Sequence, residues 1–103
     1  MKATLNSKVA DTISGRIVGD QRLSVSHCCI FMSLILLYQK NGMTNPFPMS
    51  RKHVMELSHV QSTATYHKCL EQLQTYGYIK YNPSFSYYKR STIYIENILT
   101  QQP

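Results

Sequence analysis

The sequence predicts one small domain that is mainly α-helical and ends in a β-hairpin. Its 103 residues match the size of a single domain, and its 43% content of hydrophobic residues is near that of folded proteins. Much of the chain carries apolar side chains at helical spacing, interrupted by glycine and proline. The segment after Gly77 combines short runs of strand-forming residues with turn signals.

Residues 1–25 are predicted to form an N-terminal extension. Apolar side chains repeat every four positions from Leu5 to Ile13, which favours a short helix there. The pair Gly19-Asp20 is typical of a turn, so we expect a small hairpin or an extended arm after this helix. No stretch within the extension is apolar over the length that a secretory signal requires.

A long helix is predicted over residues 26–40. Ser24 or Ser26 suits its N-cap, and Asn41-Gly42 suits its end. Nearly every position from Cys28 to Tyr38 is apolar, which is typical of a helix buried on more than one side. We expect one side to face the core and the other to meet the N-terminal segment or a second copy of the chain. The sequence therefore predicts a homodimer through this helix and the N-terminal segment.

A short helix is predicted over residues 51–58. Before it, Pro46 and Pro48 exclude a helix over residues 43–49 and leave a loop or an edge strand there. Ser50 is well placed to cap the short helix, because its hydroxyl oxygen can accept from a first-turn N–H.

A third helix follows after the three-residue connection 59–61. Ser62 caps it, and it runs to about Tyr76 before Gly77 ends it. Its apolar positions form one stripe at helical spacing: Tyr66, Cys69, Leu70, Leu73 and Tyr76.

A β-hairpin is predicted next, with strands at Tyr78–Tyr81 and Thr92–Glu96. Two short helices joined by a short turn form a helix-turn-helix, and a hairpin directly after the second helix makes it winged. The predicted fold class is therefore a winged helix-turn-helix, mainly α with a small β-hairpin wing. Its three-helix core and wing occupy residues 26–96, after the N-terminal extension and before a polar C-terminal tail at 97–103.

The region after the long helix resembles a known family. Ser62–Tyr66, with Leu70, Leu73 and Gly77–Ile79, resembles the recognition-helix segment of bacterial winged helix-turn-helix transcription factors, over about residues 28–96. Small winged-helix proteins of bacterial mobile elements are more narrowly similar, at Ser50-Arg51, Thr65–Leu70 and Gly77–Ser84. The resemblance implies a DNA-binding transcriptional regulator. The chain lacks the effector domain of larger regulators, so no small-molecule ligand is expected.

The charge of the chain favours an anionic partner. There are 11 Lys+Arg against 5 Asp+Glu, a formal net charge of +6, which points first to nucleic acid. In this fold the third helix enters the major groove of duplex DNA with its N-terminal residues nearest the base edges. The candidates for base contact are Ser62, Thr63, Thr65, His67, Lys68 and Gln72. The candidates for contact with the DNA backbone are Arg51, Lys52, Lys80, Tyr87, Lys89 and Arg90.

Other classes of function receive no support from the sequence. The five acidic residues are scattered, and no nucleophile elbow or phosphate loop occurs, so we expect no catalysis. The His and Cys residues at 27–29 and 67–69 do not converge on a helix, so no metal or other cofactor is expected. Three cysteines do not make a disulfide framework. The longest apolar run, residues 28–38, is about half of a membrane span of roughly 20 residues. A cytoplasmic protein with no membrane partner is therefore predicted.

Two alternatives to a transcriptional regulator stay open. The first is an architectural, excision or replication-initiation factor of a mobile element, which would bend or mark its DNA. The second is a winged-helix protein–protein interaction module without DNA binding, in which the apolar helix over residues 26–40 would be the working surface.

Overall fold

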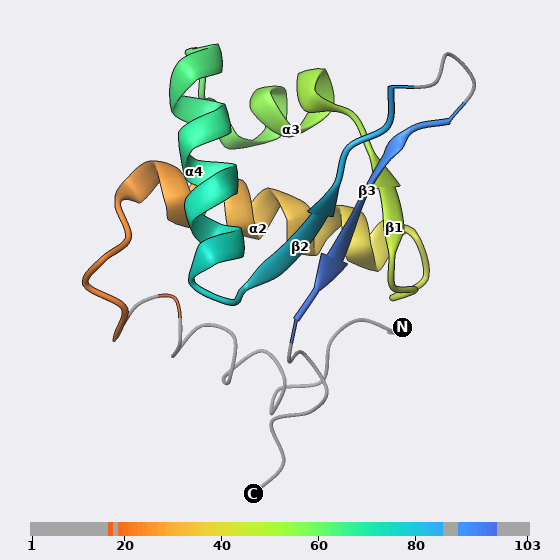
Figure 1. The fold of residues 1–103 in the computed structure, drawn as a ribbon, viewed down its shortest axis with the longest axis horizontal. Helices are drawn as coiled ribbons and strands as arrows, with labels where there is room; N and C mark the ends of the chain where they lie inside the picture. The colour runs from red at the N-terminus through yellow and green to blue at the C-terminus, as the bar shows by residue number, and fades with distance from the viewer. Residues whose placement is uncertain (1–16, 18, 86–88, 97–103) are drawn as a thin grey trace, which may run out of the picture.

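The computed structural model describes residues 17, 19–85 and 89–96 of the chain (Figure 1). The helix expected over Leu5–Ile13, the candidate Tyr87 and the tail at 97–103 lie outside the described residues. Within the described residues, the elements with defined bounds are three helices and a three-stranded antiparallel sheet. In chain order they are α2 (Val25–Lys40), β1 (Phe47–Met49), α3 (Arg51–Ser58), α4 (Thr63–Thr75), β2 (Ile79–Asn82) and β3 (Ser91–Ile95).

The sheet is larger than the expected hairpin, because β1 joins it. Its strand order is β1-β3-β2, so β3 is central and Thr92 lies opposite both Pro48 of β1 and Asn82 of β2. Before β1, the side-chain amide of Asn45 exchanges two hydrogen bonds of 3.0 Å with the backbone of Ile95. Of the two structures expected around Pro46 and Pro48, the edge strand is therefore the one that forms.

The start of α2 depends on a reciprocal cap. Ser24, rather than Ser26, is the N-cap. Its Oγ accepts from the backbone N–H of His27 at 3.4 Å, and its own backbone N–H donates to Nδ1 of His27 at 2.9 Å. This is a capping box with histidine in the place where Glu or Gln is usual. At the other end, Gly42 has a φ of 72°, a left-handed conformation that suits glycine.

The core lies where α2 and α4 meet the sheet (Figure 1). Leu70 and Leu73, which helical spacing placed on the packed side of α4, are 2% and 0% exposed. Phe31 of α2 meets Tyr78 edge to face, with 5.6 Å between the ring centroids. These contacts fix α4 against α2 and against the beginning of β2.

One face of α2 is exposed, and most of the N-terminal segment, one of the two partners expected to cover it, lies outside the described residues. Val25, Met32 and Leu36 are 79%, 45% and 49% exposed. Their spacing of seven and four residues places them in a single stripe along the helix. The inner face supplies Ile30, Leu34 and the other buried side chains of the helix.

Local chemistry sets the angle between α3 and α4. His59 ends α3 with a φ of 61°, and Val60 is buried in the connection. The Oγ of Ser62 then accepts from the backbone N–H of Thr65 at 3.2 Å, which caps α4. Gly77 follows α4 with a φ of 86° in a Schellman arrangement, so the chain can turn into β2.

Candidate nucleic-acid interface

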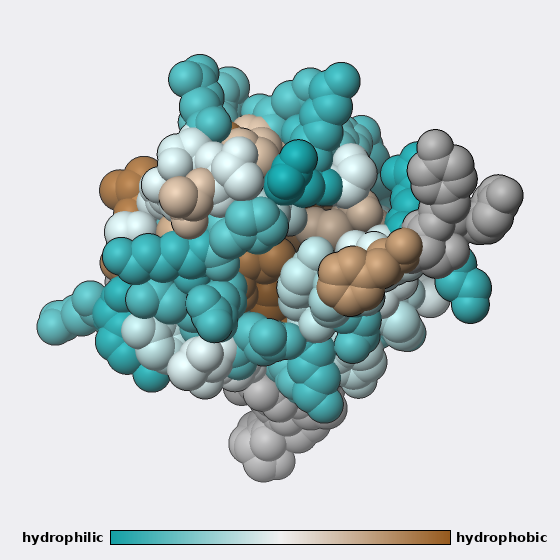
Figure 2. Space-filling view, turned by 45° about the horizontal axis from the view of Figure 1, so that its top comes forward, coloured by the Kyte–Doolittle hydropathy of each residue, from teal (hydrophilic) through white to brown (hydrophobic). Residues whose placement is uncertain are grey.

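The beginnings of α3 and α4 and the loop between β2 and β3 lie on one side of the molecule, at the top of Figure 1. Figure 2 turns this side toward the viewer and shows a mainly hydrophilic surface. Seven exposed side chains from these three places form what we call the basic surface: Arg51, Lys52, Thr63, His67, Lys68, Lys89 and Arg90.

The five Lys and Arg side chains of the basic surface form no ion pair with the described residues. The ion pairs among those residues are Arg22–Asp20 at 2.6 Å and Lys80–Glu96 at 3.7 Å. Lys80, a candidate for backbone contact, is therefore already paired, and it lies near the start of β2 rather than at the loop. The basic surface thus keeps its positive charges available to an external anion.

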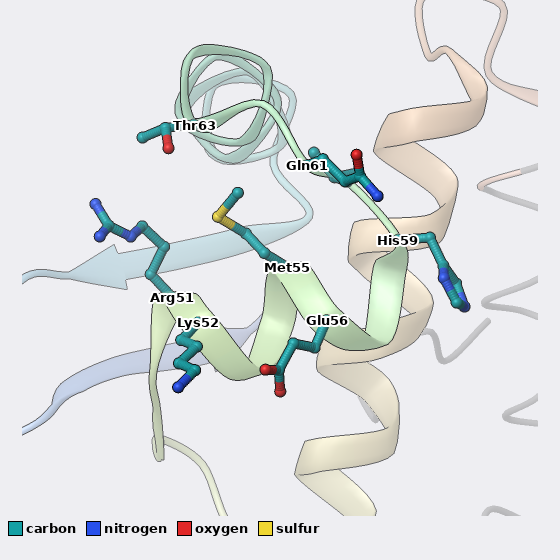
Figure 3. A pocket seen from close by; sticks show the side chains of 8 residues that line it. Arg51, Lys52, Met55, Glu56, His59, Gln61 and Thr63 are labelled. Atoms are coloured by element: carbon teal, nitrogen blue, oxygen red, sulfur yellow. The ribbon is translucent and has the colours of Figure 1, made fainter.

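A groove of about 520 Å³ separates α3 from the start of α4 (Figure 3). Arg51 and Thr63 lie at one end of it, Met55 lies between the two helices, and Gln61 and His59 lie toward the other end. The cation, amide and hydroxyl groups give the groove several hydrogen-bond donors. Sequence analysis did not single out Met55, His59 or Gln61, because helical spacing and turn position do not reveal a groove.

Three of the base-contact candidates lie on the basic surface. Thr63 lines the groove beside α3. His67 and Lys68 are exposed on α4, and the ring of His67 packs edge to face on that of Tyr66 with 5.2 Å between centroids. This contact limits the freedom of the imidazole while its ring nitrogens stay on the outside of α4.

Ser62 and Thr65 do not line the groove that Thr63 lines. Together with Val25 and Cys29 of α2, they line a second groove of about 390 Å³. The Oγ of Ser62 is used to cap α4, although the hydroxyl proton remains available to donate. The structure therefore separates these two candidates from Thr63.

Gln72, the sixth base-contact candidate, is hydrogen-bonded to another helix of the protein. Its Oε1 accepts from Nε2 of His27 at 2.7 Å, across 45 positions of sequence. Because His27 is 5% exposed and its Nδ1 accepts from Ser24, both ring nitrogens are satisfied. Gln72 thus links α4 to the cap of α2. No local sequence signal predicts this hydrogen bond between Gln72 and His27.

The hydroxyl of Tyr66 is a buried polar group without a hydrogen-bond partner among the described residues. The residue is 1% exposed. Burial raises the pKa of the phenol to about 12, with a smaller contribution from Tyr81, while Arg51 acts in the opposite direction.

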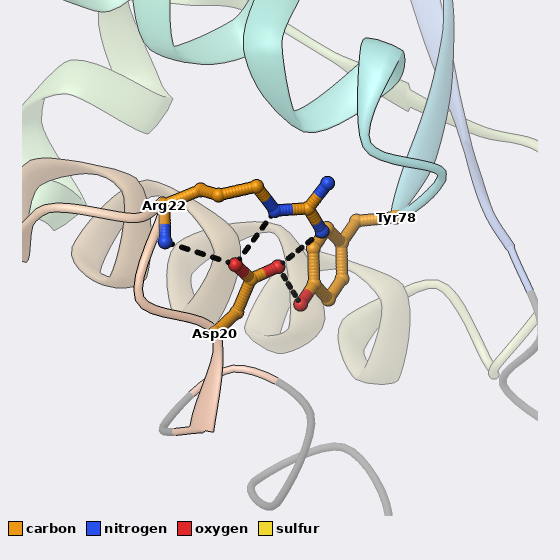
Figure 4. A network of polar contacts seen from close by, with 3 residues as sticks. All are labelled: Asp20, Arg22 and Tyr78. Atoms are coloured by element: carbon orange, nitrogen blue, oxygen red, sulfur yellow. Dashed lines mark hydrogen bonds and ion pairs between the residues drawn. The ribbon is translucent and has the colours of Figure 1, made fainter.

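A polar network ties the segment before α2 to the end of α4 (Figure 4). The carboxylate of Asp20 accepts from Nε and Nη2 of Arg22 at 2.8 and 2.6 Å, and from the hydroxyl of Tyr78 at 2.8 Å. These hydrogen bonds hold the pKa of Asp20 well below its usual range, and those from Arg22 have the largest effect. The guanidinium of Arg22 also lies 4.1 Å from the ring centroid of Tyr76. Residues 20–22 therefore form a clamp between the segment before α2 and Tyr78.

The cysteines and histidines do not gather into a metal-binding group. Among the described residues, no three or more His, Cys, Asp or Glu side chains come close enough to hold an ion. Burial raises the pKa of the Cys28 and Cys69 thiols, which lowers their thiolate fraction at neutral pH.

Comparison with known proteins gives no relative: no family model, curated protein or solved structure matches this chain. As for membranes, none of the helices in the described part of the chain combines the length and apolar character that crossing a bilayer demands.

Proposed function

We propose that this protein is a winged helix-turn-helix that binds duplex DNA sequence-specifically and acts as a small transcriptional regulator. The observation that carries the proposal is the basic surface, where five Lys and Arg side chains with no ion pair among the described residues share one side of the molecule with the exposed start of α4. The layout of the described elements supports it: two short helices, a short connection, a helix-ending glycine and an antiparallel strand pair follow in order.

In this proposal α4 enters the major groove. Thr63, His67 and Lys68 face the base edges, where Lys can donate to guanine acceptors and Thr to several bases. Arg51 and Lys52, at the start of α3, neutralise phosphates and thereby fix the register of α4 on the duplex. The first-turn N–H groups of α4 add a site that suits a phosphate oxygen.

The β2–β3 loop forms the wing. Lys89 and Arg90 are exposed on it and contact the sugar-phosphate backbone beside the groove that α4 occupies. Gln72 and Lys80 are left out of the contact set, because each already has a partner within the protein. Ser62 and Thr65 lie at the edge of the proposed DNA-contact surface, where they line a groove together with residues of α2.

We further propose that two copies of the chain pair through the exposed stripe of α2. Val25, Met32 and Leu36 offer apolar side chains at the alternating three- and four-residue spacing of a helix–helix seam, with Cys29 between them. A dimer doubles the number of base contacts, which a single small domain needs for specificity. Light scattering after gel filtration tests this: wild type should elute at twice the mass of Leu36→Glu, and equal monomeric masses would refute pairing.

DNA binding is tested by fluorescence anisotropy with a labelled random-sequence duplex. We expect a dissociation constant on the order of 10⁻⁴–10⁻⁶ M that rises steeply with salt, because counterions are released from phosphates. Lys68→Ala should weaken binding, whereas the matched control Lys40→Ala removes the same charge from the last turn of α2 and should have little effect. Equal losses in both variants would mean that net charge alone drives binding, and no binding at low salt would favour the protein–protein interaction module.

A further inference from the structure

Phe85 is the most exposed large hydrophobic residue that the structure describes. It is 96% exposed, against 40–79% for Val25, Met32, Leu36 and Tyr94. Single exposed apolar side chains are common on protein surfaces. The exposure of Phe85 is therefore informative only together with its position and its surroundings.

The base of the loop that carries Phe85 is held firmly. The strands β2 and β3 pair up to Asn82 opposite Thr92. Beyond that pair, the backbone N–H of Ser84 donates to Oγ of Ser91 at 3.0 Å and closes the base of the loop. Phe85 directly follows Ser84, so the closed base of the loop determines where its backbone lies.

The surroundings of Phe85 are basic and lie on the basic surface. Residues 83–90 contain Lys89 and Arg90 and no acidic residue. The described ends of the loop lie on the same side of the molecule as the starts of α3 and α4 (Figure 1). An exposed apolar ring in a loop that also carries two cations, neither of them ion-paired among the described residues, suits duplex DNA, which has an anionic backbone and an apolar stack of bases.

We infer that Phe85 is a wedge that inserts between stacked base pairs and kinks the bound duplex. The inference rests on the proposed DNA binding and adds a consequence to it. Side chains of this kind enter from the minor groove, partly unstack one base step and bend DNA by about 20–90°. Lys89 and Arg90 would hold the phosphates on either side of the kink, and flexible pyrimidine–purine steps would be favoured as the site.

The test is energy transfer between dyes at the two ends of a 30-bp duplex (a length of our choosing, about three helical turns) selected from a random pool by wild-type protein. At saturating protein, wild type should raise the transfer efficiency because the ends approach each other. Phe85→Ala should bind the same duplex but lose most of this rise, and Phe85→Leu, which keeps an apolar wedge, should retain it. Lys89→Ala is the matched control: it should weaken binding and leave the bend of the saturated complex unchanged.

Three other results would contradict the wedge, and they can be told apart from one another. If Phe85→Ala bends the duplex as wild type does, the wedge is refuted while the proposed DNA binding stands. If wild type binds no duplex, both proposals fail together. If Phe85→Ala leaves the bend unchanged but abolishes binding to vesicles of anionic phospholipid, the ring serves a membrane surface instead. Because Phe85 is almost fully exposed, its replacement should leave the thermal midpoint unchanged, so lost bending cannot be ascribed to unfolding.

Discussion

Removing the hydroxyl of Tyr66 should make this protein more stable. Tyrosine hydroxyls in protein cores are usually hydrogen-bonded, and Tyr→Phe then costs stability. Here the residue is 1% exposed and its hydroxyl has no partner among the described residues, so folding strips the group of water without compensation. A buried polar group left unsatisfied costs about 1–3 kcal/mol. Tyr66→Phe keeps the ring and its packing and removes only this cost.

The expected gain is about 1 kcal/mol or more in the free energy of unfolding, measured by urea denaturation. For a domain of this size, about 1 kcal/mol corresponds to a rise in Tm of roughly 4–8 °C. Tyr78→Phe is the matched control, because its hydroxyl donates to Asp20 at 2.8 Å, and its Tm should fall. A fall in both variants would show that the hydroxyl of Tyr66 has a partner and would refute the reasoning.

Three further predictions concern the core, the clamp and the link between α2 and α4. Leu70→Ala should lower the free energy of unfolding by about 2–5 kcal/mol in urea denaturation, since the side chain is 2% exposed, and a loss below about 1 kcal/mol would contradict its place in the core. The folded-state pKa of Asp20 is lowered, so its contribution to stability is complete above about pH 4 and is lost as the pH falls. In thermal melts, the Tm of wild type should therefore fall more steeply in acid than the Tm of Asp20→Asn. Parallel curves of Tm against pH would refute the clamp. Gln72→Ala should lower the free energy of unfolding by about 1–3 kcal/mol, because it leaves Nε2 of His27 unpaired, and should leave duplex affinity within about twofold; unchanged stability with lost affinity would return Gln72 to the base-contact set.

Local chemistry was enough to predict α2, α3 and α4. The hydroxyls of Ser50 and Ser62 cap α3 and α4 as expected, and Gly77 ends α4 because its left-handed φ of 86° suits glycine. Each of these signals acts within one helical turn, so it is present in the sequence itself. The same holds for the packed stripe of α4, where Leu70 and Leu73 are fully buried.

Features that depend on distant residues were not predictable. The strand β1 is three residues long and contains Pro48, so the sequence left a loop and an edge strand both open there, and pairing with β3 is what selects the strand. Helical periodicity placed Gln72 among the polar residues of α4, but His27 binds it from 45 positions away. Lys80 is likewise paired with Glu96 across the sheet. Charge and helical spacing could therefore select candidate residues, but only the tertiary structure shows which of them already have a partner within the protein.

The most direct test of the central claim is a backbone amide NMR titration of the protein with duplex DNA. The account predicts that the largest shift changes occur at the starts of α3 and α4 and at the described ends of the β2–β3 loop, near Arg51, Thr63, Lys68 and Lys89. Amides along the outer stripe of α2, near Met32 and Leu36, should change little. Changes confined to α2, or none at all at low salt, would contradict DNA binding by the basic surface.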